Sequence, residues 1–215
     1  MARTVVVANA PWRWTSRFAA LVRGADRVLA ADGGANHLAR LGVRPEAVVG
    51  DLDSILPHVR AWVGEDRLVP RPDQNFTDLE KTLLYAVDEL GVRTLTVLAA
   101  TGGRLDHALA NLGLVGRLAG RAEVEVVDEL TRIVAVRGTA SFATTPGQTV
   151  SLVPLGHCPA VTTSGLRWSL QAEPLDLLGR TGVSNVALGT RVELTVDGGT
   201  LLVFFHHLGE FATTW

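Results

Sequence analysis

Short apolar runs alternate with segments of helical periodicity along the first 130 residues. Apolar, largely β-branched runs predict buried strands over residues 4–8, 28–31, 48–49, 67–69, 94–100 and 123–127. Between them, apolar positions three or four residues apart predict helices over residues 16–22, 35–41, 77–90 and 105–118. Such alternation is typical of an open, mostly parallel sheet with helices on both faces. We therefore expect an α/β domain over residues 1–130.

The pattern changes after Glu129, where helical periodicity disappears. Apolar runs between glycine-rich turns predict strands over residues 131–136, 140–142, 149–154, 160–163, 191–196 and 201–205. Short strands separated by turns are typical of β-sandwiches. We expect residues 131–215 to form an all-β sandwich domain.

Two helices of the first domain carry clear side-chain patterns. Thr77 stands three residues before Glu80, which is the capping-box spacing. The apolar stripe of this helix leaves Asp78 and Lys81 on the opposite side, free at a helix N-terminus that favours anions. In the helix over 105–118, we expect the core-facing stripe to contain Leu105, Leu109, Leu112 and Val115.

Composition narrows the class of partner. The 215 residues carry a net charge of −2, which gives no general attraction to nucleic acid or to an anionic membrane. No apolar run approaches the roughly 20 residues of a membrane span, and no signal-peptide pattern precedes the first strand. We expect a cytoplasmic protein that acts on small molecules. All but one of the 20 basic residues are arginine, so Lys81 is a candidate for a role that needs a compact point charge.

The strand expected at 48–49 leads into Gly50, Asp51, Leu52 and Asp53. If the chain stays extended through Leu52, the two aspartates project to the same side. Two carboxylates that close need a cation, and their hard oxygen atoms suit Mg²⁺. The alternative is a polar turn that caps the next helix.

Further acids follow other strands of the expected sheet. Ligands of open α/β sheets bind at the carboxyl ends of the strands. Five acids are expected at this edge, namely Asp32, Asp51, Asp53, Asp78 and Asp106. Their convergence is tolerable around a divalent metal ion.

Two glycine pairs, Gly33-Gly34 and Gly102-Gly103, follow strands at the same edge. Without Cβ atoms they allow backbone amides to approach phosphates, although each pair alone is also compatible with an ordinary turn. Lys81 and Arg104 add positive charge. Acids, cations and glycines together indicate a nucleoside triphosphate site, and the absence of a Gly-x-x-x-x-Gly-Lys-Ser/Thr motif excludes a P-loop enzyme.

Four segments resemble, in order and spacing, the successive motifs of the thiamine pyrophosphokinase family: residues 31–36, 50–54, 72–78 and 103–107. The resemblance continues into the β domain at residues 163–168 and 182–185. It implies transfer of the intact diphosphate of ATP to the hydroxyl group of thiamine, giving thiamine diphosphate and AMP. It also implies that the β domain binds thiamine and pairs in a homodimer.

The resemblance further implies roles for individual residues. The metal ligands for Mg²⁺ are Asp51, Asp53, Asp78 and Asp106, and the phosphate contacts are Lys81 and Arg104. The nucleotide contacts are Asp32, Gly33, Gly34, Asn36, Gln74, Thr77, Gly102, Gly103 and Asn111. The thiamine contacts are Trp168, Ser184 and Asn185, with a core position as the alternative for Trp168. The chain departs from the family pattern at Asn75, where many relatives carry an acid.

Three other functions stay open at this point. One is a related diphosphokinase that acts on another alcohol, such as a hydroxymethylpterin. Another is an Asp-x-Asp nuclease or primase-like domain, which would need the basic stripe that this sequence lacks. The third is a catalytically silent nucleotide-binding protein, which the departure at Asn75 keeps open.

Overall fold

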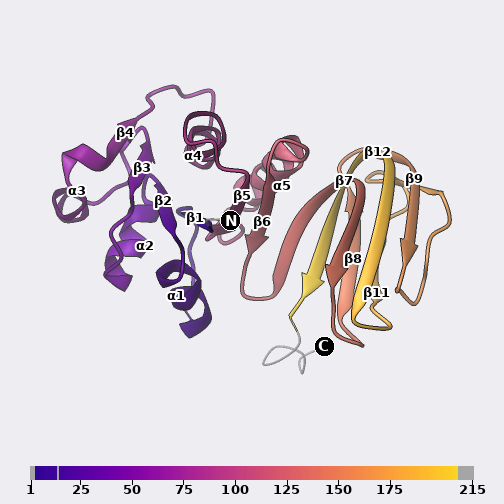
Figure 1. Cartoon of the computed structure of the whole chain (residues 1–215). Coiled ribbons are helices and arrows are strands. Elements are labelled where there is room, and N and C mark those ends of the chain that lie inside the picture. Colours follow the sequence, from indigo (N-terminus) through magenta and orange to yellow (C-terminus); the bar gives the residue numbers. More distant parts are fainter. Residues whose placement is uncertain (1–2, 14, 208–215) are drawn as a thin grey trace. The chain divides into compact units, whose positions relative to one another are not determined.

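The computed structural model describes residues 3–13 and 15–207, which form two compact units (Figure 1). The first unit comprises Met1–Leu114 and Arg121–Asp128, and the second comprises Val115–Gly120 and Glu129–Trp215. No helix of the described residues is long and apolar enough to cross a membrane.

The first unit is built on a six-stranded parallel sheet, as expected for an α/β domain. Its strands are β1 (Thr4–Val7), β2 (Arg27–Ala31), β3 (Ala47–Gly50), β4 (Leu68–Pro70), β5 (Thr94–Leu98) and β6 (Glu123–Val127). The spatial order is β6-β5-β1-β2-β3-β4, and each neighbouring pair is parallel. The chain therefore moves in opposite directions from β1, and such a switch point opens a crevice at the carboxyl ends of the strands.

Helices follow the strands of this sheet. They are α1 (Ser16–Arg23), α2 (Gly34–Leu41), α3 (Pro57–Val63), α4 (Asp78–Leu84) and α5 (Leu105–Leu118), with a 3₁₀ turn at Glu65–Arg67 and a π-helical turn at Tyr85–Glu89. Side-chain caps begin α1 and α4, because Thr15 and Thr77 accept hydrogen bonds from the backbone of Phe18 and Glu80. Helix α3 was not predicted, since only Pro57 at its first turn marks it.

The prediction that Asp78 and Lys81 are free opposite the apolar stripe of α4 is wrong, because Lys81 Nζ lies 3.0 Å from Asp78 Oδ1 in an ion pair. Lys81 is 7% exposed, and Thr82 is fully buried with its hydroxyl group donating to the backbone oxygens of Asp78 and Val49. The reason is that α4 contacts both β2 and β3, so more than its apolar stripe is covered.

The predicted core-facing stripe of α5 is also wrong at its N-terminal end. Leu105 is 81% exposed and Leu109 is 64% exposed. Val115 is buried as predicted, and the other buried apolar side chains of the helix are Ala108, Leu114 and Leu118. Only the two predicted residues nearest the N-terminus of the helix, Leu105 and Leu109, are exposed to solvent.

The second unit is a β-sandwich, as expected. Its strands are β7 (Thr131–Ala143), β8 (Thr149–Pro154), β9 (His157–Ser164), β10 (Glu173–Asp176), β11 (Gly182–Val186) and β12 (Arg191–His206). The last strand pairs with β9 through its first half and with β8 through its second half, with a shift between Val196 and Leu201. Gly198 and Gly199 lie at this shift with φ near +80° and +81°. One long strand thus replaces two predicted short ones, and Val150, Leu152, Val161, Leu194 and Phe205 belong to the core.

Candidate active site

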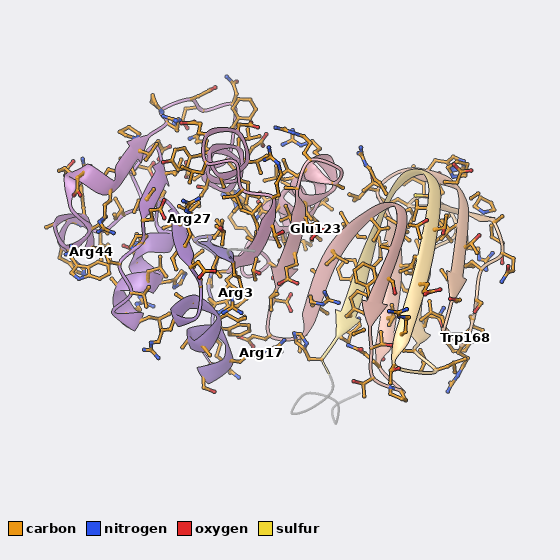
Figure 2. The ribbon with its side chains drawn as sticks, viewed as in Figure 1. Arg3, Arg17, Arg27, Arg44, Glu123 and Trp168 are labelled. Carbon is orange, nitrogen blue, oxygen red and sulfur yellow. The ribbon has the colours of Figure 1, made fainter. Side chains whose placement is uncertain are left out.

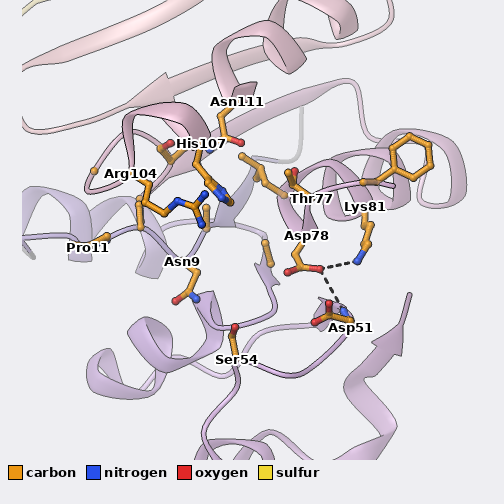
Figure 3. Close-up of a pocket in the computed structure, with 18 of the residues that line it drawn as sticks. Asn9, Pro11, Asp51, Ser54, Thr77, Asp78, Lys81, Arg104, His107 and Asn111 are labelled. Carbon is orange, nitrogen blue, oxygen red and sulfur yellow. Dashed lines mark hydrogen bonds and ion pairs between the residues drawn. The ribbon is translucent and has the colours of Figure 1, made fainter. Parts of the chain in front are cut away.

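A cavity of about 440 Å³ lies in the first unit at the carboxyl ends of β1, β2, β3 and β5 (Figure 3). It is lined by the loops that follow these strands and by the first turn of α4. A cavity of this size can hold much of a nucleotide. It coincides with the crevice that the strand order creates.

Three carboxylates gather at this cavity. Asp32, Asp51 and Asp78 each offer an oxygen atom, and these atoms lie within 4.8 Å of one another. Gly50 makes room for them, because a Cβ atom there would lie 2.8 Å from Cβ of Asp32 and 2.9 Å from Oδ1 of Asp78. Hard oxygen donors converging in this way are a suitable ligand set for Mg²⁺.

Asp78 links the acid cluster to Lys81. Its Oδ1 accepts a hydrogen bond from the backbone N–H of Asp51 at 3.3 Å and from Nζ of Lys81 at 3.0 Å (Figure 3). Gln74 donates to Asp51 Oδ2 at 2.9 Å, and this hydrogen bond lowers the pKa of Asp51 below its usual value. Acids and lysine are thus fixed relative to one another before any ligand binds.

Asp32 is the buried member of the cluster, with 1% of its surface exposed. Burial raises the pKa of Asp32 to about 6, opposed by its hydrogen bond from Ser54 and reinforced by the charges of Asp78 and Asp51. Its ionised form is therefore costly unless positive charge is present nearby.

Asp53 lies outside this cluster. Strand β3 ends at Gly50, and Leu52 adopts φ +65°, so the chain does not stay extended and the two-residue period does not apply. The side chain of Asp53 is exposed and accepts a hydrogen bond from Ser54 Oγ at 2.8 Å. The expectation that Asp51 and Asp53 project together fails for this reason.

Asp106 also lies apart, in an ion pair with Arg104. The guanidinium group donates to both carboxylate oxygens at 3.2 and 2.5 Å, and this bidentate contact lowers the pKa of Asp106 to about 2. Both side chains are largely exposed, although Arg104 lines the cavity. Of the five expected acids, the described residues bring three together.

The glycine pairs make room for the loop after β1, which was not predicted to belong to the site. A Cβ atom at Gly33 would lie 2.3 Å from Asn9 Nδ2, and one at Gly102 would lie 2.2 Å from the backbone oxygen of Pro11. At Gly34 it would lie 2.0 Å from the backbone oxygen of Val7. The glycines therefore permit close packing of the loop after β1, which lines the cavity. Its position after a strand, at the same edge as the acids, was the signal for it.

The other expected nucleotide contacts divide into two groups. Gln74, Thr77 and Asn111 line the cavity, and Asn111 donates to the backbone oxygen of Ala100 at 2.8 Å. Asn36 does not line it and instead bonds to the backbone of the loop after β3. Cavity residues that were not predicted include Asn9, Ser54, Phe76 and His107.

The expected thiamine contacts lie in the second unit. Trp168 is 58% exposed, which excludes a core position (Figure 2). The buried amide of Asn185 accepts a hydrogen bond from Trp168 N at 3.1 Å and donates to Trp168 O at 2.8 Å. Asn185 thus holds the backbone of the tryptophan, while Ser184 is exposed with φ +59°.

An open α/β sheet with clustered acids and a buried lysine at its switch point is characteristic of enzymes that act on polyphosphates with a divalent cation. Residues 18–127 match the family model described as "Thiamin pyrophosphokinase, catalytic domain". Residues 139–201 match "Thiamin pyrophosphokinase, vitamin B1 binding domain". The chain belongs to the thiamin pyrophosphokinase family.

Individual relatives agree with this assignment. Thiamine pyrophosphokinase 1 of Oryza sativa subsp. japonica is 29% identical in an alignment that covers 84% of this chain and 80% of that protein. Among solved structures, thiamin pyrophosphokinase from Geobacillus thermodenitrificans has a TM-score of 0.81 at 23% identity and covers 97% of this chain and 99% of its own. The Candida albicans enzyme has a TM-score of 0.80 at 17% identity, with 95% and 88% covered. At these identities the structural matches establish the fold alone.

Proposed function

We propose that this protein transfers the diphosphate of ATP to the hydroxyl group of thiamine, giving thiamine diphosphate and AMP. The observation that carries the proposal is the cluster of Asp32, Asp51 and Asp78 beside the buried Lys81. Asp51, Asp78 and Lys81 line the cavity, and the chain matches both domain models of the family. In the reaction the thiamine oxygen forms a bond to the β-phosphorus of ATP. The bond from that phosphorus to the bridging oxygen of AMP breaks, and the alcohol proton is released.

Negative charge on the phosphates is the main electrostatic problem of this reaction. Lys81 is held by Asp78 and offers a fixed point charge to a phosphate oxygen. Arg104 lines the same cavity and offers a planar fork for bidentate contact. Gln74, Thr77 and Asn111 line the cavity as candidate nucleotide contacts.

Mg²⁺ is the proposed cofactor, held by Asp51 and Asp78 with Asp32 beside them. When bound, it neutralises carboxylates and phosphates together. Asp53 and Asp106 lie outside the cluster and would hold the ion through water. The donor set consists of hard oxygen atoms, as Mg²⁺ requires.

Thiamine is proposed to stack on Trp168, whose exposed indole offers an aromatic face to a flat or cationic ring. Ser184 and Asn185 would support the same segment. A homodimer formed through the second unit is supported by its exposed apolar side chains, with Leu178 97% and Leu188 60% exposed. We place the protein in the cytoplasm, where ATP and Mg²⁺ are available, and propose no nucleic acid or membrane partner.

The test is incubation of the purified protein with Mg-ATP and thiamine, followed by separation of the nucleotide products. AMP and thiamine diphosphate in equal amounts are expected, and Asp51→Asn is the matched inactive variant. ADP as the product would overturn the diphosphate transfer. Turnover with a hydroxymethylpterin but not with thiamine would favour the related diphosphokinase, and no turnover with either would favour a silent nucleotide-binding protein.

A further inference from the structure

The loop between β3 and α3 is held from behind by side chains of the β2–α2 segment. Asp32 accepts hydrogen bonds from the backbone N–H groups of Ser54 at 2.9 Å and Ile55 at 3.1 Å. Asn36 donates to the backbone oxygen of Ser54 at 3.0 Å and accepts from the N–H of Leu56 at 3.0 Å. Two side chains one helical turn apart thus satisfy four backbone groups of three successive residues.

These contacts occupy the polar atoms of both side chains. Each carboxylate oxygen of Asp32 accepts one backbone N–H, and the oxygen and nitrogen of the Asn36 amide are both engaged. Asn36 does not line the cavity, whereas Ser54 does. The geometry therefore favours a contact of Asn36 with the loop over a contact with a nucleotide.

The loop needs such support because its backbone is strained. Leu52 has φ +65°, a region that residues other than glycine seldom adopt. Conformations of this kind persist where the surrounding structure fixes them. At its front end the loop is tied by Asp51 N to Asp78, and at its back end by Asp32 and Asn36.

We propose that Asn36, together with Asp32, is a positioning residue that fixes the backbone at 54–56, so that the Asp51 carboxylate stays oriented for a divalent cation. This inference rests on the proposed function for the identity of the ligand. Asn36 is the residue to test, because it carries no charge. Its removal alters the loop without altering the electrostatics of the acid cluster.

The experiment compares Asn36→Ala with Gln148→Ala. Gln148 is the matched control, because its amide likewise accepts from one backbone N–H (Thr145) and donates to one backbone oxygen (His206), but in the second unit. Mn²⁺ is titrated by calorimetry into each protein saturated with α,β-methylene ATP, which cannot be cleaved at the proposed bond. Binding of the same analogue in EDTA is measured in parallel.

Asn36→Ala is expected to lose about tenfold in Mn²⁺ affinity, the lower end for residues that orient metal ligands. Analogue binding in EDTA should change less than about twofold, in keeping with the absence of direct contact. Gln148→Ala should retain both affinities. Asn36→Ser, which keeps a donor and an acceptor on a shorter arm, should recover part of the loss.

Unchanged Mn²⁺ affinity in folded Asn36→Ala would overturn the inference. So would an equal loss of analogue binding in EDTA, since that result would indicate a direct nucleotide contact. If both Asn36 variants fail to fold, the residue serves the stability of the whole unit and the inference is also wrong. The titration contains no thiamine and does not depend on diphosphate transfer. A protein that binds Mn²⁺ normally in this titration but forms no AMP from ATP and thiamine would count against the proposed function alone.

Discussion

Two acid–cation pairs stand at the first turns of two helices on the same edge of the sheet, and they differ in almost every physical respect. Asp78 and Lys81 of α4 are 3.0 Å apart, and the lysine side chain is 5% exposed. Arg104 and Asp106 flank the start of α5 with side chains 72% and 63% exposed. In the sequence both appear as an acid and a base at the start of a predicted helix.

The difference shows that burial determines how an acid–cation pair can act on a ligand. The side chain of Lys81 is buried, so its position depends on Asp78, and its charge acts in a medium that screens it weakly. The pair of Arg104 and Asp106 is exposed to water, where ion pairs contribute little that can be measured. Arg104 can therefore exchange its partner for a phosphate at small cost, whereas Lys81 is preorganised.

The largest effect is expected from Asp78→Ala, which breaks the buried pair. Turnover should fall at least about 10³-fold, and the free energy of unfolding should fall by about 3 kcal/mol because Lys81 is left buried without its counter-charge. AMP formation and urea unfolding measure the two effects. Near-normal turnover would show that Asp78 serves neither lysine nor metal.

The next largest effect is a pH dependence of the free energy of unfolding that arises from Asp32, the buried acid beside Asp78. In the metal-free protein, the raised pKa of Asp32 (about 6, against the ordinary 3.8) keeps its proton in the folded state after the unfolded chain has released it. The free energy of unfolding should therefore fall as pH rises from about 4 to about 6, by up to roughly 3 kcal/mol.

The difference between wild type and Asp32→Asn isolates this effect. Burial lowers the pKa of His37, and its opposite contribution cancels in that difference because both proteins contain it. Urea unfolding at a series of pH values in EDTA provides the measurement. A difference that stays constant with pH would contradict the raised pKa.

Lys81→Arg should have a moderate effect even though the charge is kept. The guanidinium fork does not fit a space made for a buried ammonium group, so turnover should fall by about tenfold. The reciprocal substitution at the exposed pair, Arg104→Lys, should lower turnover less than Lys81→Arg does, because the Arg104 side chain is exposed. Steady-state kinetics of both variants test the contrast, and equal losses would remove it.

The smallest effect is expected from Asp106→Asn on stability. The exposed pair is lost, yet the urea midpoint should not move measurably. Any change in turnover would then come from freeing Arg104 or from a contact made only with substrate bound. A clear drop in the midpoint would show that the exposed pair does stabilise the fold.

Apart from α3, the strand and helix order of the first unit was predictable because it depends on local periodicity. The face of α5 was not, since periodicity shows which residues share a stripe but not which stripe is covered. Leu105 and Leu109 illustrate this, as their spacing matches a core stripe although solvent reaches them.

The composition of the acid cluster was predictable in part. Asp32 and Asp51 follow from the rule that strand ends meet at one edge, and Asp78 was expected there because it opens a helix on the same edge. Asp53 did not follow, because a single left-handed residue at Leu52 turns it away, and nothing in the chemistry of leucine marks such a turn.

The close packing of Gly33, Gly34 and Gly102 limits which substitutions this wall of the cavity can accept. A Cβ atom at Gly33 would overlap the Asn9 side chain, and one at Gly34 or Gly102 would overlap the backbone oxygen of Val7 or Pro11, so each of these positions disfavours a side chain. Libraries that vary one position at a time should find this wall of the cavity intolerant. A redesign that places a side chain at one of these glycines would have to move the part of the β1 segment that it packs against.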